Sequence, residues 1–324
     1  MRALVGAIAA TAVVLAATGC GSSSETSSGD GPTVVATTTQ IADFARNVVG
    51  DNGRVVQLLP ANADAHDFEP TSDDLKAVAE ADVILANGLH LDDWVEKLRE
   101  SSGTSASVVV TTKGITAREA DEDEHGHEEG DAHEATKTGE DHDHGDHAED
   151  PHAWMDPDNA RIMVTNIADA MATAAPEHAD AYRANAAAYE KKLTELTTKL
   201  DDMIATVPAN ERRIVTDHDA FGYLTDRFGI TTVGTILPSL STSAEPSAQD
   251  LARLADELKK AGVRVVFPEA AISPKLSEAL AKEAGVRVGP VLYADSLGPE
   301  GSGAETYIEM MTTNMTALVE GMRG

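Results

Sequence analysis

Cysteine is almost absent from this chain of 324 residues, and its scarcity limits how the protein can be held together. The single cysteine is Cys20, near the N-terminus. An intramolecular disulfide needs two cysteines, and a thiolate cage for zinc needs several. Histidine and carboxylate side chains are therefore the ligands that remain for a tightly bound metal ion.

Basic residues are also scarce. The chain has 25 lysines and arginines against 55 aspartates and glutamates, which gives a formal net charge of −30 at pH 7. Nucleic acid and anionic lipid surfaces repel such an acidic chain, whereas cations are attracted to it. We therefore expect no nucleic-acid partner.

Several catalytic motifs are missing as well. The sequence contains no His-Glu-x-x-His helix, no Gly-x-Ser-x-Gly elbow and no glycine-rich phosphate loop. These motifs carry the chemistry of metalloproteases, serine hydrolases and nucleotide-dependent enzymes. Their absence disfavours an enzyme.

The N-terminus has the pattern of a secretory signal peptide, predicted over residues 1–19. Its apolar run, Ala3–Ala17, is too short for a helix that spans a bilayer. The following Thr18-Gly19-Cys20 resembles the lipobox of bacterial lipoproteins, which predicts a lipid anchor on Cys20. Because Ala17 stands where a lipobox usually has leucine, simple secretion is the alternative. Residues 20–31 are rich in serine and glycine and are predicted to form a flexible tether.

An acidic and histidine-rich insertion is predicted over residues 118–150. Fifteen carboxylates lie between Glu119 and Asp150, and their charge predicts a disordered loop when metal is absent. Imidazoles at such density offer weak, interchangeable ligands for a borderline metal such as zinc, so the loop either captures or senses the ion. A solvated insertion without a metal function is the alternative. The six histidines are His125, His127, His133, His142, His144 and His147.

The rest of the chain alternates short β-branched runs with longer amphipathic segments, such as Ile41–Val49 and Thr71–Ala79. This pattern predicts an α/β fold with two lobes, each containing a mainly parallel sheet flanked by helices. The N-terminal lobe is predicted over residues 32–175 and the C-terminal lobe over 208–324. The predicted strands are Val34–Ala36, Val55–Leu58, Val83–Leu85, Val108–Val110, Arg213–Val215, Thr231–Val233, Val263–Phe267 and Val286–Val288.

One long, rigid helix is predicted to join the two lobes over residues 176–207. Proline stands at both limits, Pro176 and Pro208, and the segment between them is rich in good helix formers. A coiled-coil partner helix is the alternative interpretation. Apolar residues at helical spacing are Tyr182, Ala186, Tyr189, Leu193, Leu196, Leu200 and Met203.

Four residues are candidate metal ligands. His66, His218 and Asp295 each follow a predicted strand, and His152 lies in the segment Asp150-Pro-His-Ala-Trp-Met-Asp-Pro157. Ligands of α/β sheets bind outside the carboxyl ends of the strands, so these side chains are placed to meet. Three imidazoles and a carboxylate suit zinc in a closed four-ligand geometry, with manganese as the alternative. Taken singly, each histidine is more often only a satisfied polar residue.

The sequence contexts of these residues resemble the cluster A-I metal-binding solute receptors, which are zinc and manganese lipoproteins of bacterial ABC importers. The resemblance runs from about Pro32 to the end of the chain. The matching segments, in order, are Ala65-His-Asp-Phe-Glu-Pro-Thr71, Asn87-Gly-Leu-His-Leu91, Asp150-Pro-His-Ala-Trp-Met-Asp-Pro157, Thr216-Asp-His-Asp-Ala-Phe-Gly-Tyr-Leu224, Ser243-Ala-Glu-Pro-Ser247 and Tyr293-Ala-Asp-Ser-Leu297.

This resemblance implies a monomeric extracytoplasmic receptor, anchored to the cell membrane through Cys20, that captures a metal ion between its lobes and delivers it to an ABC permease. His66 and His152 would come from one lobe, and His218 and Asp295 from the other. Members that resemble manganese receptors often have glutamate where this chain has His218, and the histidine-rich insertion is typical of zinc receptors. The resemblance therefore favours zinc, with a manganese-preferring receptor as the alternative.

Two other classes of function remain open. A surface lipoprotein that acts in cell adhesion need not bind metal tightly. A metal-dependent hydrolase would need a coordination position that stays open to water, and a fourth protein ligand closes that position.

Carboxylates that orient the ligating imidazoles are expected nearby, because a ligating histidine usually donates its other ring N–H to such a group. By proximity the candidates are Asp150, Asp156, Asp217 and Asp219. The alternative for Asp150 and Asp156 is that they stabilise turns before proline. His90 is interpreted as a pocket-edge or surface residue, and His178 as solvated.

Overall fold

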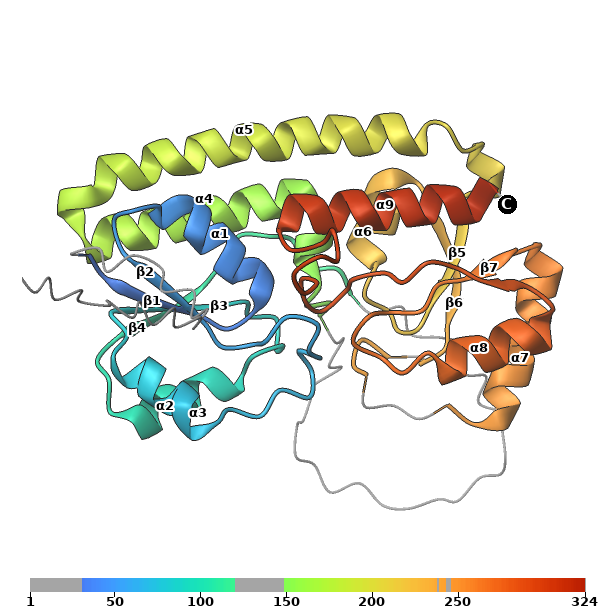
Figure 1. Ribbon diagram of the computed structural model, residues 1–324, viewed down its shortest axis with the longest axis horizontal. Coiled ribbons are helices and arrows are strands. Elements are labelled where there is room, and N and C mark those ends of the chain that lie inside the picture. The colour runs from blue at the N-terminus through green and yellow to red at the C-terminus, as the bar shows by residue number, and fades with distance from the viewer. Residues whose placement is uncertain (1–30, 120–148, 238, 243–245, 324) are drawn as a thin grey trace, which may run out of the picture.

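The computed structural model describes residues 31–119, 149–237, 239–242 and 246–323. Two lobes lie side by side, and one long helix runs across both of them (Figure 1). The predicted signal peptide, tether and anchor at Cys20 lie outside the described residues, as do the six histidines of the insertion. None of the described helices is both long enough and apolar enough to cross a bilayer.

The N-terminal lobe contains a parallel sheet of four strands in the order β2-β1-β3-β4. Alternate residues of a strand point to opposite faces, so neighbouring valines on β1 enter two different cores. Val34 packs with α1 and α4, whereas Val35 packs with α2 and α3. The elements are β1 (Thr33–Ala36), α1 (Thr39–Val49), β2 (Arg54–Gln57), α2 (Ser72–Ala79), β3 (Val83–Ala86), α3 (Trp94–Ser102), β4 (Ser107–Val110) and α4 (Pro157–Ala174).

The C-terminal lobe contains two pairs of parallel strands, β5-β6 and β7-β8. A hydrogen bond from the backbone N–H of Phe267 to the carbonyl of Val215, at 2.9 Å, connects the β5 segment with the end of β7. The last two strands are shorter than predicted, with only two residues in each regular ladder. The elements are β5 (Arg213–Thr216), α6 (Gly222–Phe228), β6 (Thr231–Thr235), α7 (Ala248–Ala261), β7 (Val265–Val266), α8 (Lys275–Ala284), β8 (Arg287–Val288) and α9 (Tyr307–Arg323).

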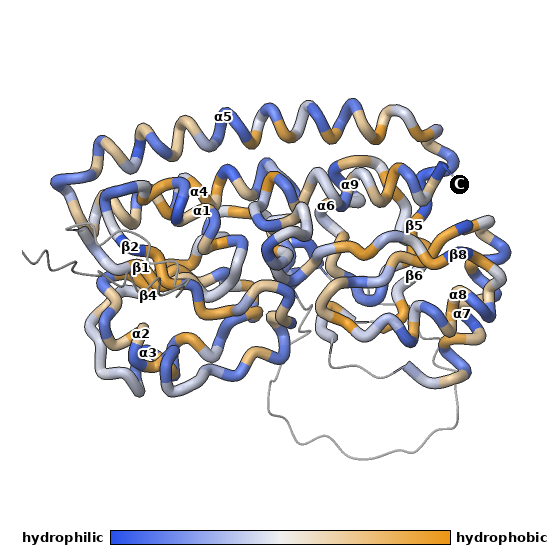
Figure 2. The backbone as a smooth tube through the Cα atoms, in the orientation of Figure 1, coloured by the Kyte–Doolittle hydropathy of each residue, from blue (hydrophilic) through white to orange (hydrophobic). Residues whose placement is uncertain are grey.

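The long helix is α5 (Ala179–Ile204), whose 26 residues correspond to about 39 Å. It is preceded by a 3-10 turn at Pro176–His178 and ends three residues before Val207, so the regular α-helix is shorter at both ends than the sequence predicts. Ahead of Pro208 the chain tightens into bonds of the 3-10 type, from the N–H of Thr206 to the carbonyl of Met203 at 3.2 Å and from Val207 to Ile204 at 3.0 Å, so the regular α-helix ends early. Figure 2 shows α5 as alternately polar and apolar along its length, as an amphipathic surface helix requires.

The apolar face of α5 is buried against both lobes. Tyr182 donates a hydrogen bond to the carbonyl of Asn52 at 2.7 Å in the N-terminal lobe, and Leu200 belongs to the same apolar cluster as Met315 of α9. One continuous cluster of buried side chains thus runs from β1 to α9. The two-lobe α/β fold is confirmed, and the packing of α5 on its own chain accounts for its apolar stripe without a coiled-coil partner.

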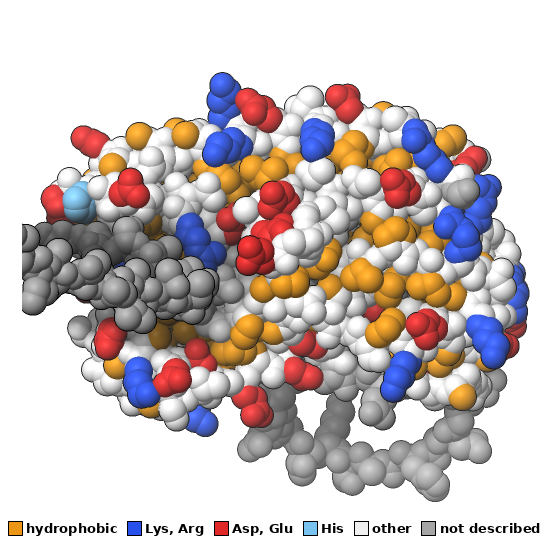
Figure 3. Space-filling view, viewed as in Figure 1, with side chains coloured by type: hydrophobic (Ala, Val, Ile, Leu, Met, Phe, Trp, Pro, Cys, Tyr) orange, Lys and Arg blue, Asp and Glu red, His pale blue; other side chains and the backbone are white. Residues whose placement is uncertain are grey.

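Charge is spread unevenly over the surface. On the face shown in Figure 3, acidic and basic side chains occur over both lobes, and one group of acidic side chains lies near the middle of the molecule. Because like charges repel, the acidic surface near the junction of the lobes favours the approach of cations rather than anions.

Candidate metal centre

The four candidate ligands lie together where the lobes meet. One ligand atom from each of His66, His152, His218 and Asp295 lies within 4.8 Å of all the others. Asp295 Oδ1 is 3.7, 3.4 and 3.5 Å from the Nε2 atoms of His66, His152 and His218, and the Nε2 atoms of His66 and His152 are 3.1 Å apart. Segments separated by more than 200 residues therefore converge on one point.

A turn after β2 positions His66. The Asp64 carboxylate accepts the backbone N–H of His66 at 2.9 Å through Oδ1, and it accepts the Thr242 hydroxyl at 2.6 Å through Oδ2. Asn62 in the same turn has a φ of +60°, a left-handed conformation that asparagine tolerates better than most residues. The N–H of Asn62 donates to the carbonyl of Leu297 at 2.9 Å. The loop that carries His66 is thus fastened to the C-terminal lobe at two points.

His152 directly precedes the short 3-10 helix Ala153–Met155 at the start of α4. Asp150 Oδ1 accepts the backbone N–H of His152 at 2.9 Å and lies 2.8 Å from its Nδ1. A carboxylate can only accept, so Nδ1 is the donor and Nε2 faces the other ligands. Both side chains are fully buried. Asp150 therefore keeps a proton on Nδ1, so that Nε2 is the nitrogen that binds a metal ion.

His218 follows β5, and its orienting carboxylate is Glu269, which was not among the residues predicted from the sequence. Glu269 Oε1 accepts the backbone N–H of His218 at 2.9 Å, and Oε2 lies 2.7 Å from Nδ1. Asp217 supports Glu269 in turn, because it accepts the backbone N–H of Glu269 at 2.8 Å and the hydroxyl of Ser277. Glu269 comes two residues after Phe267, at the carboxyl end of a predicted strand. That position is the feature of the sequence from which Glu269 could have been predicted as part of the centre.

Asp295 lies on a loop after β8 that the N-terminal lobe holds in place. The carbonyl of the preceding residue, Ala294, accepts hydrogen bonds from Gln40 Nε2 and Trp154 Nε1, both at 3.2 Å. Two residues after Asp295, the N–H of Leu297 donates to Thr39 Oγ1 at 2.8 Å. Both carboxylate oxygens of Asp295 are buried without a hydrogen-bond donor in ordinary geometry among the described residues. A buried carboxylate in that state is expected to have a cation as its partner.

The charges in the centre shift the pKa values of its groups in opposite directions. Burial lowers the pKa of His66 to about 4. Burial acts in the same direction on His152, but its hydrogen bond with Asp150 and the nearby negative charge of Asp295 outweigh it and raise the pKa to about 9. Burial also opposes protonation of His218, yet Glu269 and Asp295 raise its pKa well above the ordinary value. Burial would raise the pKa of Asp295, but the imidazoles, His218 first, hold it well below the ordinary value.

The donor set and its spacing fit a small divalent ion. Ligand atoms about 2.0–2.1 Å from a tetrahedral zinc ion are about 3.3 Å from one another. Asp295 Oδ1 lies 3.4 to 3.7 Å from the three Nε2 atoms and the Nε2 atoms of His66 and His152 are 3.1 Å apart, distances that bracket that value, and all the ligand atoms lie within 4.8 Å of one another. Four protein ligands would fill a tetrahedral shell, which suits holding an ion rather than activating water.

The other predicted residues have different surroundings. Asp156 accepts the backbone N–H of Asp158 at 2.9 Å and caps α4 directly before Pro157, which fits the alternative of a carboxylate that stabilises a turn before proline. Asp219 lies 3.7 Å from Arg118 Nη1. His90 has a side chain that is 77% exposed and bonds Asp93, and His178 is half-buried with its ring 6.0 Å from that of Tyr182. Of these residues, only Asp219 is a chain neighbour of a candidate ligand.

The described ends of the histidine-rich insertion lie close to the centre in sequence and in space. Glu119 and Glu149 form an isolated antiparallel bridge, and the N–H of Asp150 donates to the carbonyl of Arg118 at 2.7 Å. The two ends of the insertion therefore lie side by side, directly before Asp150 and His152.

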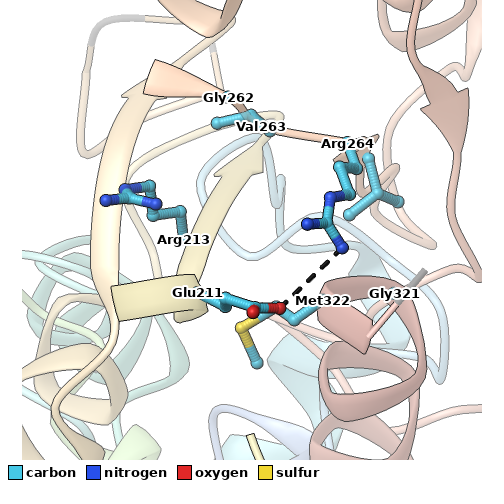
Figure 4. A pocket seen from close by; sticks show the side chains of 8 residues that line it. Glu211, Arg213, Gly262, Val263, Arg264, Gly321 and Met322 are labelled. Carbon is cyan, nitrogen blue, oxygen red and sulfur yellow. Dashed lines mark ion pairs between the residues drawn. The ribbon is translucent and has the colours of Figure 1, made fainter. Parts of the chain in front are cut away.

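A small hollow of about 40 Å³ lies elsewhere in the C-terminal lobe (Figure 4). Arg213 begins β5 and Arg264 precedes β7, so the hollow is at the amino ends of strands, opposite to the edge that carries His218. Arg264 Nη1 is 3.8 Å from Glu211 Oε2, and no histidine lines the cavity. Its basic lining does not suit a metal cation.

Two lobes that hold three imidazoles and a carboxylate at their junction define a substrate-binding receptor for metal ions, not an enzyme. The chain belongs to the ZnuA family, described as zinc-uptake complex component A, periplasmic, whose profile matches residues 34–321. The predicted membership of the metal-binding receptors of ABC importers is confirmed.

Relatives with known names bind different metals. The chain is 30% identical over 312 residues to the manganese-binding lipoprotein MntA of Halalkalibacterium halodurans, and the match covers 96% of this chain and 95% of that protein. It is 34% identical over 288 residues to the iron-binding protein YfeA of Yersinia pestis, with 89% and 85% covered. The zinc-binding protein AdcA of Streptococcus pyogenes is 33% identical over 288 residues, which are 88% of this chain and 55% of AdcA. All three relatives are named for metal binding, but each is named for a different metal.

Solved structures show the same fold. The periplasmic zinc-binding protein TroA of Treponema pallidum has a TM-score of 0.76 and 25% identity, with 90% of this chain and 99% of that chain covered. The Mn-bound periplasmic metal-binding protein from Candidatus Liberibacter asiaticus has a TM-score of 0.75 and 26% identity, with 90% and 99% covered. Cell adhesion, one of the alternatives from the sequence, finds no support in these likenesses.

Proposed function

We propose that this protein is a high-affinity extracytoplasmic zinc receptor that holds the ion with His66, His152, His218 and Asp295 and delivers it to an ABC permease. The observation that carries the proposal is the buried Asp295 carboxylate, whose oxygens have no hydrogen-bond donor among the described residues while three imidazole nitrogens lie within 3.7 Å of Oδ1. That arrangement is a ligand set that a cation would complete.

The preference for zinc over manganese rests on the ligand types. Three of the four proposed ligands are nitrogen atoms, and manganese favours sites with more oxygen. Both relatives and structural neighbours with manganese in their names exist, so a manganese-preferring receptor remains the alternative.

The location and the partners are part of the same proposal. The signal peptide at residues 1–19 and the small residues before Cys20 support export and a lipid anchor, and the MntA relatives are named as lipoproteins. We propose a monomer with an N-terminal lobe at 32–175, the connecting segment at 176–207 and a C-terminal lobe at 208–324. The shared apolar core under α5 supports lobes that move little relative to one another.

Competition between metals tests the proposed function directly. We expect protein purified without added metal to contain close to one equivalent of zinc by elemental analysis. In equilibrium competition, zinc is expected to displace manganese even when manganese is in excess. A protein that retains manganese against equimolar zinc would establish the alternative, and one that binds neither ion would refute the receptor.

The insertion is expected to add weak metal sites without affecting the tight one. Replacement of residues 120–148 with a two-residue Asn-Gly turn keeps Glu119 and Glu149, whose bridge closes the chain at the base of the insertion. Titration calorimetry of the shortened protein should show one tight zinc site with unchanged affinity and should lose several weak sites. Identical stoichiometry before and after the deletion would refute capture of metal by the insertion.

A further inference from the structure

Arg118 joins the two lobes at the base of the insertion. Its Nη1 atom lies 3.6 Å from Asp150 Oδ2 and 3.7 Å from Asp219 Oδ2, and its Nε lies 3.1 Å from Asp226 Oδ2. Asp150 begins the segment of His152, whereas Asp219 and Asp226 belong to the segment of His218 and to α6. With a side chain only 17% exposed, Arg118 is a shielded cation between carboxylates of both lobes.

Asp150 divides its two oxygens between His152 and Arg118. Oδ1 accepts from the backbone N–H and the Nδ1 of His152. Oδ2 makes no hydrogen bond among the described residues, so the guanidinium 3.6 Å away is the charge that faces it. Breaking a buried charge pair by removing one partner is strongly destabilising. Loss of Arg118 would therefore weaken the hold of Asp150 on the imidazole.

The backbone and the shape of α6 fix the position of Arg118. The Tyr223 hydroxyl accepts the N–H of Arg118 and donates to the carbonyl of Asp150, both at 2.9 Å. Beside it, Gly222 leaves room for the guanidinium, because a Cβ there would lie 2.6 Å from Arg118 Cζ and 2.7 Å from Nε. Gly222 and Tyr223 of α6 thus hold Arg118 of the other lobe in position.

We infer that Arg118 is a positioning residue for the metal centre: it holds Asp150 against His152 and fastens that ligand to α6 of the C-terminal lobe. The inference rests on the proposed function and adds the contact through which the base of the insertion and the second lobe act on His152. Arg118 acts on the proposed ligand through Asp150.

Substitutions on both sides of this contact test the inference. Arg118→Gln is expected to weaken zinc binding about tenfold, because loss of a group that orients a ligand costs about 10- to 100-fold. Arg118→Lys, which keeps the charge without the planar fork, should restore part of the affinity. Gly222→Ala should weaken binding in the same direction without removing any charge. The matched control is Arg227→Gln on α6, whose ion pairs are with Asp201 and Asp158, and its affinity should equal that of the wild type.

A double-mutant cycle with Asp150→Asn separates positioning from general damage. If Arg118 acts through Asp150, adding Arg118→Gln to Asp150→Asn should lower the affinity by less than about twofold. Fully additive losses, or wild-type affinity in Arg118→Gln alone, would overturn the inference. Thermal melts of each variant in chelator identify any that fail to fold. If Arg118→Gln does not fold, the affinities of Gly222→Ala and Arg118→Lys test the inference in its place.

A readout that needs no metal keeps this inference distinct from the proposed function. In metal-free protein, the Nδ1–H proton of His152 should give a downfield NMR signal, because it donates to a carboxylate, and Arg118→Gln should shift or broaden it. A wild-type protein that binds no zinc would refute the proposed function alone. An unchanged Nδ1–H signal in Arg118→Gln would refute the role of Arg118 alone.

Discussion

Replacement of His152 with alanine should lower zinc affinity at least about 100-fold, the largest loss expected from any single substitution in the centre. Two effects add: one of four ligand atoms disappears, and the buried Asp150 carboxylate loses the imidazole that donates to it. Loss of an orienting partner alone costs about 10- to 100-fold, and loss of a ligand costs more. Competition titration against a chromogenic zinc chelator measures the change.

Other substitutions rank the ligands. His66→Ala and His218→Ala should each weaken binding at least about tenfold, and Asp295→Ala comparably or less. His178→Ala is the control, since this histidine lies before α5 and contacts Tyr182 rather than the centre. An affinity for His152→Ala close to that of the wild type would remove His152 from the ligand set.

Zinc affinity should fall steeply as the pH decreases, already below about pH 9. In the metal-free protein the pKa of His152 is about 9 and that of His218 is also raised, so both imidazoles carry a proton at neutral pH. Zinc must displace these protons, and each one contributes about a tenfold loss of apparent affinity per pH unit. His66, with a pKa of about 4, contributes nothing above about pH 5. With the ordinary histidine pKa of about 6.5, the decline would begin only below about pH 6.5.

Calorimetry counts the displaced protons. Zinc titrations at about pH 7 in two buffers of different ionisation enthalpy should show release of up to about two protons per ion. Asp150→Asn removes an anion that raises the pKa of His152, so this variant should release fewer protons. Affinity that stays constant between about pH 8 and 6 would contradict the prediction, and it would show that the imidazoles are neutral before the ion arrives.

The alternation of strands and helices was readable from the sequence because local patterns carry it. The run Thr33–Ala36 is rich in β-branched residues and buried on both faces, as parallel strands covered by helices are. The short C-terminal strands were overestimated, since Val263–Phe267 has the composition of a longer strand but pairs regularly over only two residues. Ladder length depends on the partner strand, and no local pattern reports the partner.

The residues of the metal centre also fall into those that the sequence identified and one that it did not. His66, His152, His218 and Asp295 were identifiable because each stands in a distinctive local segment, and Asp150 because it is two residues from His152. Glu269 lies 51 residues from the histidine that it contacts. Its partner could not be inferred from spacing along the chain.

By itself the sequence determined the α/β class, the long helix and the type of metal ligand. With one cysteine and eleven histidines in the chain, nitrogen and oxygen atoms are the donors that remain. The tertiary structure alone decided which carboxylates orient the imidazoles, and it placed Arg118 of one lobe on α6 of the other. The physical reason is that residue type and periodicity are local properties. Contacts between lobes depend on how α5 and α9 pack into one shared core.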